Sequence, residues 1–489
     1  MTLGLGLGSD SGDGGEELPG GSAGELPEGW ARATLGELTE PISERYKPTS
    51  SDEFPYLGMD NVESHSGRII SFGIAREIKS SSPTVRPGYL LYGRLRPYLN
   101  KVTLANFTGI CSGEFIVFPP TGALDSRFLL YRMLSPDFTH YVMEKNPTGD
   151  RPRAHWEQFS DFPILLPPLA EQRRIVAEIE QQIAHIEAGE AALQAAEDSL
   201  RIFFQATLNN ALKGELTSDD LSEGDGSDLV PEETLLSDAP WTIPETWRWS
   251  KLGDLFKVSV GSTPSRGIPS HWNGDVPWVS SGEVSFNRIT STRESISRTS
   301  LTNAESRIHP PGTVMLAMIG EGKTRGQAAI LDIKAAHNQN CASIRVSETK
   351  ILPEYIYYTL VARYEDTRSS ASGGNQPALN KAKVQAIPVP VPPLGTQRKI
   401  VQILESARGE VSAIGDILDS SREQAQELRA ALLHAAFTGA LTPQDPADEP
   451  ASALLDRIRA ERATARKAPR KRTTGKPRSS PPGQEELPQ

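Results

Sequence analysis

The stretch LLPPLAEQRRIVAEIE (Leu165–Glu180) returns later in the chain as PVPPLGTQRKIVQILE (Pro390–Glu405). The two copies continue without a gap over 165–216 and 390–441, where ALKGEL in the first corresponds to AFTGAL in the second. A block that recurs at a constant spacing indicates that one structural unit is used twice. The repeat therefore predicts a chain built from two related halves.

Each copy has the pattern of one long helix. It opens with a proline pair, which suits the entry to a helix, and Gly214 and Gly439 stand where a helix would end. Between them, apolar residues at steps of three and four mark a single stripe. The sequence predicts long helices over 167–214 and 392–439. The stripe residues are Ile175, Ile179, Ile183, Ile186, Leu193, Leu200, Ile400, Leu404, Val411, Ile414, Leu418 and Leu432.

A single apolar stripe on so long a helix needs a partner. The simplest partner is the other copy, which predicts an antiparallel coiled coil of the two helices, a spacer between the two halves. The alternative is that each helix packs separately on its own globular module.

The segments upstream of the helices repeat more loosely. LPEGWARATLGEL (Leu26–Leu38) resembles IPETWRWSKLGDL (Ile243–Leu255), at an offset of 217 residues against 225 for the helical blocks. The modules therefore differ in length where the helical blocks do not, which favours two modules with one task and different specificities.

Both modules have a mixed pattern. Short apolar runs between Gly, Pro and Ser, such as Phe115–Phe118 and Thr313–Leu316, predict strands, and Ser126–Met133 and Pro353–Ala362 have the pattern of helices. The predicted fold class is α+β. Two mixed α/β modules, the first module over 26–166 and the second module over 243–391, are separated by the two long helices.

The net charge of −11 is unevenly distributed. Residues 1–29 carry six acidic side chains and 215–245 carry ten, with no Lys or Arg in either, whereas Arg457–Arg478 holds ten basic residues and one Glu. These compositions predict a disordered acidic N-terminus over 1–25, an acidic linker over 215–242 and a disordered basic tail over 440–489. Because local charge decides partners, the acidic total does not exclude DNA.

Several classes of protein are disfavoured. No apolar run is long enough to span a membrane, and the first residues lack the basic and apolar parts of a secretory signal. Cys111 and Cys341 are far apart in the chain and are expected to be reduced, buried thiols of a cytoplasmic protein. AMIGEGKT (Ala317–Thr324) lacks the first glycine of a phosphate-binding loop. We predict no catalytic set, no metal site and no bound cofactor.

What remains is a set of basic and amide-rich loops. Arg suits guanine, Asn and Gln suit adenine, and Lys, Ser and Thr hold phosphates, so these loops are candidates for contact with double-stranded DNA. The alternative is that they are ordinary solvated loops. In the first module the candidates are Tyr92, Arg94, Arg96, Tyr98, Lys101, Arg151 and Arg153. In the second they are Ser262, Thr263, Arg266, Lys323, Arg325, Gln327, Asn338, Asn340, Asn375, Gln376 and Lys381.

With these residues in view, the chain resembles the specificity (S) subunit of Type I restriction-modification systems, the HsdS family. The resemblance rests on the paired PPL-x-x-Q-R-x-I-V segments (Pro167–Val176 and Pro392–Val401), each at the start of a long helix that follows a globular module. It covers nearly all of 26–441. One departure is Gly395-Thr396, where the first copy has Ala170-Glu171.

The resemblance implies a non-catalytic, cytoplasmic subunit for phage defence. Each module would be a target-recognition domain that binds one half of a split DNA target, while the coiled coil sets the gap and docks two methyltransferase (M) subunits, which restriction (R) subunits join. S-adenosylmethionine, ATP and magnesium would act in those partners. One alternative is an S-like subunit of a Type II system with a combined methylase-nuclease partner, and another is a coiled-coil scaffold that recognises no DNA.

Overall fold

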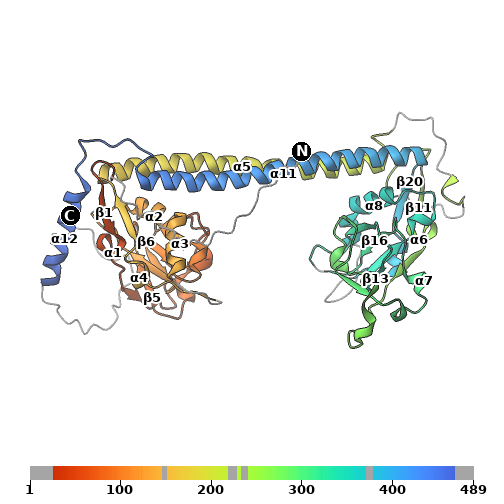
Figure 1. Ribbon diagram of the computed structural model, residues 1–489, viewed down its shortest axis with the longest axis horizontal. Helices are drawn as coiled ribbons and strands as arrows, with labels where there is room; N and C mark the ends of the chain where they lie inside the picture. The colour runs from red at the N-terminus through yellow and green to blue at the C-terminus, as the bar shows by residue number, and fades with distance from the viewer. Residues whose placement is uncertain are drawn as a thin grey trace, which may run out of the picture. The chain divides into compact units, whose positions relative to one another are not determined.

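The computed structural model describes residues 26–122, 124–145, 151–217, 228–232, 240–320, 322–369 and 378–467, with side chains up to residue 460. The chain divides into two compact units (Figure 1). The first unit comprises Met1–Ala191 and Ser421–Gln489, and the second unit comprises Ala192–Ser420. The predicted disordered N-terminus, 1–25, lies outside the described residues.

Two helices of 45 residues each, α5 (Leu169–Lys213) and α11 (Leu394–Thr438), match the predicted long helices to within two residues at each end. Both stop at a glycine in the left-handed region, Gly214 with φ of 80° and Gly439 with φ of 82°. Glycine adopts this conformation without the steric cost that a Cβ atom imposes, which is why it ends helices.

In its described residues the first unit contains three sheets, ordered β1-β10, β2-β5-β8-β3-β4 and β7-β6-β9. Its strands are β1 (Ala31–Thr34), β2 (Arg45–Tyr46), β3 (Pro55–Leu57), β4 (Gly73–Ile74), β5 (Ser82–Val85), β6 (Leu90–Gly93), β7 (Val102–Leu104), β8 (Gly109–Cys111), β9 (Phe115–Phe118) and β10 (Pro163–Leu166). Its shorter helices are α1 (Leu35–Leu38), α2 (Ser126–Leu134), α3 (Pro136–Glu144), α4 (Trp156–Phe159) and α12 (Ala451–Lys467).

The second unit repeats this plan, with sheets ordered β11-β20, β12-β19-β16-β17-β14 and β15-β13-β18. Its strands are β11 (Arg248–Lys251), β12 (Val258–Val260), β13 (Trp272–Val279), β14 (Asn287–Ile289), β15 (Glu294–Ile296), β16 (Val314–Ala317), β17 (Ala328–Leu331), β18 (Ala336–His337), β19 (Cys341–Ile344) and β20 (Pro388–Val391). Its shorter helices are α6 (Leu252–Leu255), α7 (Ala304–Arg307), α8 (Pro353–Ala362), α9 (Tyr364–Ser369) and α10 (Lys381–Gln385).

Strand pairing shows that the cores of the two modules share one topology, whereas their edge strands differ, since β2 pairs with β5 but β12 pairs with β19. β6 pairs with β9 as β16 pairs with β19, both antiparallel, and β3 pairs with β8 as β13 pairs with β18, both parallel. β1 and β10 close the first module as β11 and β20 close the second. The predicted pair of mixed α/β modules is therefore confirmed.

Both long helices contribute to the core of each unit. In the first unit, Ile175 and Ile179 near the start of α5 share a hydrophobic cluster with Leu433 and Phe437 near the end of α11. The second unit has the converse arrangement. There the end of α5 and the start of α11 share one cluster through Leu208, Ala211, Leu212, Ile400 and Leu404. Within each unit the helices therefore pack together in antiparallel order, as predicted, and the alternative of separately packed helices was wrong.

The predicted stripe is buried unevenly. Ile175, Ile179, Ile400 and Leu404 have no exposed surface, and Ile186, Leu418 and Leu432 are also buried. Ile183, Leu193, Leu200 and Val411 are half-buried. Ile414 was wrong as a stripe residue because its side chain is 41% exposed. Two helices in contact bury only a narrow strip of each other's surface. Because a helix has 3.6 residues per turn, residues at regular spacing gradually rotate away from that strip.

Each long helix ends against the start of a module. A Cβ atom on Gly214 would lie 2.4 Å from Pro244, and one on Gly439 would lie 2.5 Å from Pro27. The two junctions are thus built alike, since Pro27 and Pro244 occupy equivalent positions in the repeat.

The basic tail is folded at its beginning, which corrects the expectation of a disordered segment over 440–489. Ala451 and Leu455 of α12 are buried in the first unit's core, and the Ala451 N–H donates to the Gly29 carbonyl at 2.9 Å. The residue equivalent to Leu455 is Val230, which is 3% exposed and belongs to the second unit's core, although it lies in the predicted acidic linker. Leu455 and Val230 each have charged neighbours in the sequence, which is why neither was predicted to be buried. Residues 468–489 lie outside the described residues.

Cys111 and Cys341 are free and buried, as predicted, and burial raises the pKa of both thiols. Among the helices of the described ranges, we find none that is both long and apolar enough to cross a membrane.

Candidate nucleic-acid interface

Three segments of the first module meet at one place. The turn after β6 begins with Arg94, whose N–H donates to the carbonyl of Glu114 in the β8–β9 turn at 2.9 Å. The Arg94 carbonyl in turn accepts from the N–H of Ala154, at 2.9 Å, and the Arg96 N–H donates to the Pro152 carbonyl at 2.8 Å. Backbone bonds therefore bring together two predicted clusters that lie far apart in the sequence.

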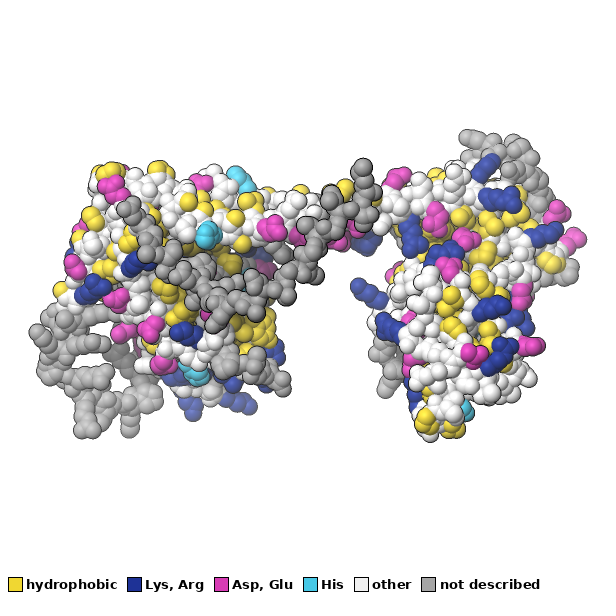
Figure 2. Space-filling model, in the orientation of Figure 1, with side chains coloured by type: hydrophobic (Ala, Val, Ile, Leu, Met, Phe, Trp, Pro, Cys, Tyr) yellow, Lys and Arg dark blue, Asp and Glu magenta, His cyan; other side chains and the backbone are white. Residues whose placement is uncertain are grey.

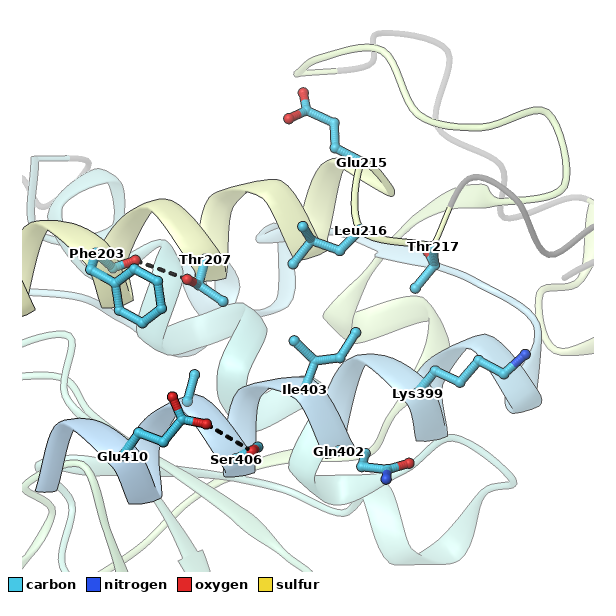
Figure 3. A pocket seen from close by; sticks show the side chains of 11 residues that line it. Phe203, Thr207, Glu215, Leu216, Thr217, Lys399, Gln402, Ile403, Ser406 and Glu410 are labelled. Carbon is cyan, nitrogen blue, oxygen red and sulfur yellow. Dashed lines mark hydrogen bonds between the residues drawn. The ribbon is translucent and has the colours of Figure 1, made fainter. Parts of the chain in front are cut away.

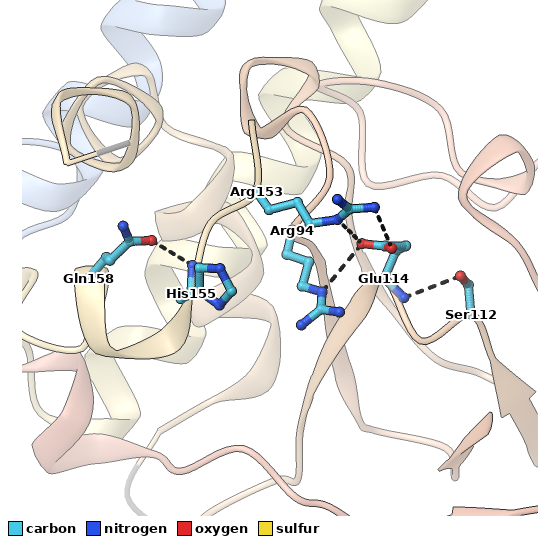
Figure 4. Close-up of polar contacts among 6 residues, drawn as sticks. All are labelled: Arg94, Ser112, Glu114, Arg153, His155 and Gln158. Atoms are coloured by element: carbon cyan, nitrogen blue, oxygen red, sulfur yellow. Dashed lines mark hydrogen bonds and ion pairs between the residues drawn. The ribbon is translucent and has the colours of Figure 1, made fainter. Parts of the chain in front are cut away.

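A carboxylate joins these clusters (Figure 4). Arg153 donates to both oxygens of Glu114, from Nη2 to Oε1 at 3.1 Å and from Nε to Oε2 at 3.2 Å. Arg94 donates from Nε to Oε2 at 3.3 Å. The hydrogen bond from Arg153 is the main reason that the pKa of Glu114 lies below its usual value, although partial burial opposes the shift. The carboxylate is therefore ionised between two guanidinium groups.

The second module has the same backbone scaffold with different side chains. The Met318 N–H donates to the Asn340 carbonyl at 2.8 Å, and the Leu379 N–H donates to the Met318 carbonyl at 3.0 Å. The turn is closed in the same way, because the Asn340 N–H donates to Asn338 Oδ1 as the Glu114 N–H donates to Ser112 Oγ. Positions 94, 114 and 153 thus correspond to 318, 340 and 378.

A further loop joins this scaffold in the second module. The Ser262 N–H donates to the His337 carbonyl at 3.0 Å, and Thr263 hydrogen-bonds Gln339. Ser262 Oγ also accepts from Arg307 Nη1 at 2.9 Å. The structure therefore unites the predicted 261–266 and 337–340 clusters.

Arg266 is held in a defined position on this loop. Its guanidinium carbon lies 3.7 Å from the centre of the Trp272 ring, and Nη2 donates to Glu294 Oε2 at 2.8 Å. Because the side chain remains 60% exposed, the stacked and paired guanidinium is available to a partner.

The other predicted contact residues fall into three groups. Arg96, Tyr98, Arg151, Lys323 and Lys381 are exposed. Lys101 and Gln327 are half-buried, and the Lys101 ammonium donates to the Met59 carbonyl at 2.8 Å. Asn375 and Gln376 lie outside the described residues.

Three predicted contact residues are buried. Tyr92 was wrong, because it is 1% exposed and packs against Phe138 and Phe159 in the core. Tyr92 lies on a strand, where alternate side chains face inward. Arg325 is 8% exposed and Asn338 is 7% exposed, so neither presents much surface to a partner. Asn338 instead shapes the turn through its Oδ1 atom.

Sequence reasoning passed over the acidic residues of these loops. Glu114 and Glu294 were not among the predicted contact residues, and carboxylates repel phosphates, so their residue type alone does not point to DNA. Their arginine partners come from distant segments, so the pairing emerges only in the folded chain. Figure 2 shows a group of Lys and Arg side chains at the lower edge of the first unit, away from its long helices, and further basic side chains elsewhere on that face.

A groove runs between the long helices in the second unit (Figure 3). Its volume is about 680 Å³, and it is lined by Phe203 and Thr207 of α5, by Leu216, and by α11 between Lys399 and Glu410. Phe203 is 51% exposed and Leu216 is 40% exposed. The equivalent of Lys399 in the first unit is Arg174, which pairs with Asp448 at 2.7 Å.

Residues 244–414 match a family model that is described as "Type I restriction modification DNA specificity domain". The Type I restriction enzyme EcoDI specificity subunit of Escherichia coli is 28% identical over 205 residues, or 42% of this chain and 45% of that protein. The match thus spans less than half of that relative. The EcoKI specificity subunit of E. coli K12 is 23% identical across 92% of this chain and all of that protein.

A solved structure has the same fold. That structure concerns complex assembly and conformational transition of the type I R-M system. Its chain superposes on this one with a TM-score of 0.68 and 22% sequence identity. The superposition covers 85% of this chain and 99% of that one.

Proposed function

We propose that the chain is a specificity (HsdS) subunit of a Type I restriction-modification system, as its similarity to such subunits supports, and that it recognises a bipartite DNA target. Each module reads one half of that target. The subunit is non-catalytic, so methyl transfer and cleavage are carried out by its partners.

One observation carries this proposal: a single backbone scaffold presents different side chains in the two modules. It holds Arg94, Glu114 and Arg153 in the first module, whereas Met318 and Asn340 occupy the equivalent positions of the second. Arg suits the O6 and N7 atoms of guanine and Asn suits adenine. A shared backbone that carries different side chains, with Met318 and Ala378 in place of the two arginines, is what two readers of different half-sites require.

We propose that the helix pair sets the gap between the half-sites. A helix of 45 residues is about 68 Å long at about 1.5 Å per residue, and one turn of DNA is about 34 Å. Deleting one heptad from both α5 and α11 should shorten the tolerated gap by a few base pairs.

The partners we propose are two M subunits and the R subunits that join them, in the cytoplasm. S-adenosylmethionine, ATP and magnesium then act in those chains. Exposed Phe203 and Leu216 make the groove between the long helices of the second unit a candidate docking place for an M subunit, since apolar surface favours association.

The test is to co-express the chain with the M subunit encoded beside it and to map methylated positions in the host DNA. We expect one bipartite motif, and the heptad deletion should move its two halves closer together. Exchanging residues 30–160 for another module should change one half only. Methylation without a split motif would contradict the proposal, and an unchanged gap after the deletion would contradict the spacer.

Two further observations separate the alternatives. A Type II arrangement requires a single methylase-nuclease chain as the neighbour. A scaffold without recognition would bind all duplexes alike at moderate salt, because phosphate contacts carry no sequence information.

A further inference from the structure

Glu114 lies between two arginines that come from different parts of the first module. Arg94 follows β6 and Arg153 precedes α4, and both donate to the same carboxylate at 3.1 to 3.3 Å. The carboxylate side chain is 26% exposed, against 34% for Arg94 and 47% for Arg153. The group carries one net positive charge and remains open to solvent on the arginine side.

The contacts with Glu114 leave part of each guanidinium available. Arg153 uses Nε and Nη2, and Arg94 uses Nε alone. Within the described ranges, neither Nη atom of Arg94 nor Nη1 of Arg153 has a protein acceptor. An arginine that is held by one edge loses less side-chain entropy when its other edge binds a ligand.

The fold of the turn does not require the carboxylate. The Glu114 N–H is satisfied by Ser112 Oγ, and the Glu114 carbonyl by the Arg94 N–H. The equivalent turn of the second module forms the same bonds with Asn340 in place of the acid. Exposed ion pairs also add little to stability, typically below about 1 kcal/mol. A structural role alone therefore gives no reason for an acid at a surface that should meet phosphates.

We propose that Glu114 is a positioning residue that fixes the guanidinium groups of Arg94 and Arg153 for reading bases in the half-site of the first module. This inference rests on the proposed function. The carboxylate brings two cations close together, sets the plane of each, and lowers the attraction of the site for any phosphate backbone. It thus favours base contacts over contacts that carry no sequence information.

This role predicts opposite changes in two affinities. Glu114→Gln keeps the size of the side chain and removes its charge. Binding of the full-length chain to its cognate duplex should weaken about tenfold or more, as expected when a bidentate base contact is lost. Binding to an unrelated duplex should stay the same or strengthen, because the site has lost a negative charge. Glu114→Asp should restore part of the discrimination.

The matched control is Glu53→Gln in the same module. It makes the same charge change and breaks an exposed ion pair, in which Arg76 Nη1 lies 2.7 Å from Glu53 Oε1. Selection from a randomised duplex library should show that the Glu114 variant loses base preference in one half-site, whereas the Glu53 variant keeps both.

The outcomes separate the two proposals. If the Glu114 variant loses cognate and unrelated binding together, with a lower unfolding temperature, the residue is structural and the positioning role is wrong. If neither affinity changes, that role is equally overturned. If the wild-type chain itself prefers no duplex, the proposed function fails before any variant is made.

Discussion

Replacing Phe437 by alanine should make the first unit easier to unfold, although Phe437 lies some 270 residues beyond the end of the first module in the sequence. Its side chain is 6% exposed, its ring centre is 5.3 Å from that of Phe128, and the Arg132 guanidinium lies 5.1 Å from it. Truncating a buried Phe costs about 3 to 5 kcal/mol through lost burial and the cavity left behind. We expect this loss in the first unit alone.

The repeat supplies a matched pair of variants. The residue equivalent to Phe437 is Leu212, which is 2% exposed in the second unit's core, so Leu212→Ala should cost about 2 to 5 kcal/mol there. Leu428→Ala, on the same helix as Phe437 but 58% exposed, should change stability by less than about 0.5 kcal/mol.

The measurement is hydrogen exchange of peptides from each module across a denaturant series, which resolves the two units separately. Faster exchange in the first module after Phe437→Ala, with the second module unaffected, is the expected result. If Phe437→Ala and Leu428→Ala had equal effects, or if the second module alone responded, the end of α11 would not belong to the first unit's core.

Three further outcomes follow from the structure. Gly214→Ala and Gly439→Ala should each destabilise by at least about 1 kcal/mol, because φ is positive and the added Cβ atom meets a proline, whereas Gly189→Ala in open space on α5 should stabilise slightly in thermal unfolding. Burial lowers the pKa of His309 to about 2 and of His337 to about 4. The contribution of these neutral rings to the stability of the second unit is therefore fully present above about pH 6.5. The free energy of unfolding should fall as the pH drops towards 4. Unfolding followed by tryptophan fluorescence at a series of pH values will test this. Removing everything after residue 450 should lower the unfolding temperature of the first unit, because α12 buries Ala451 and Leu455 in its core.

The candidate site was only partly visible in the sequence. Arg94 and Arg153 were found because basic residues cluster locally, and Tyr92 was wrongly included because a local cluster does not say which side chains face inward. Glu114 was missed because its role depends on two partners far away in the chain. The charge of a short sequence window reports only local composition. A carboxylate held between two arginines requires three distant segments to meet in the folded chain.

The sequence by itself determined the duplication, the length of the two helices and their ends, because an apolar period of 3.6 and a terminal glycine act through neighbouring residues. Only the tertiary structure decided that Ile414 is exposed, that Leu455 anchors a basic tail, and that one carboxylate holds two arginines. Local patterns are set by bonds within a few residues. Burial and charge pairing depend on which distant surfaces the folded chain brings into contact.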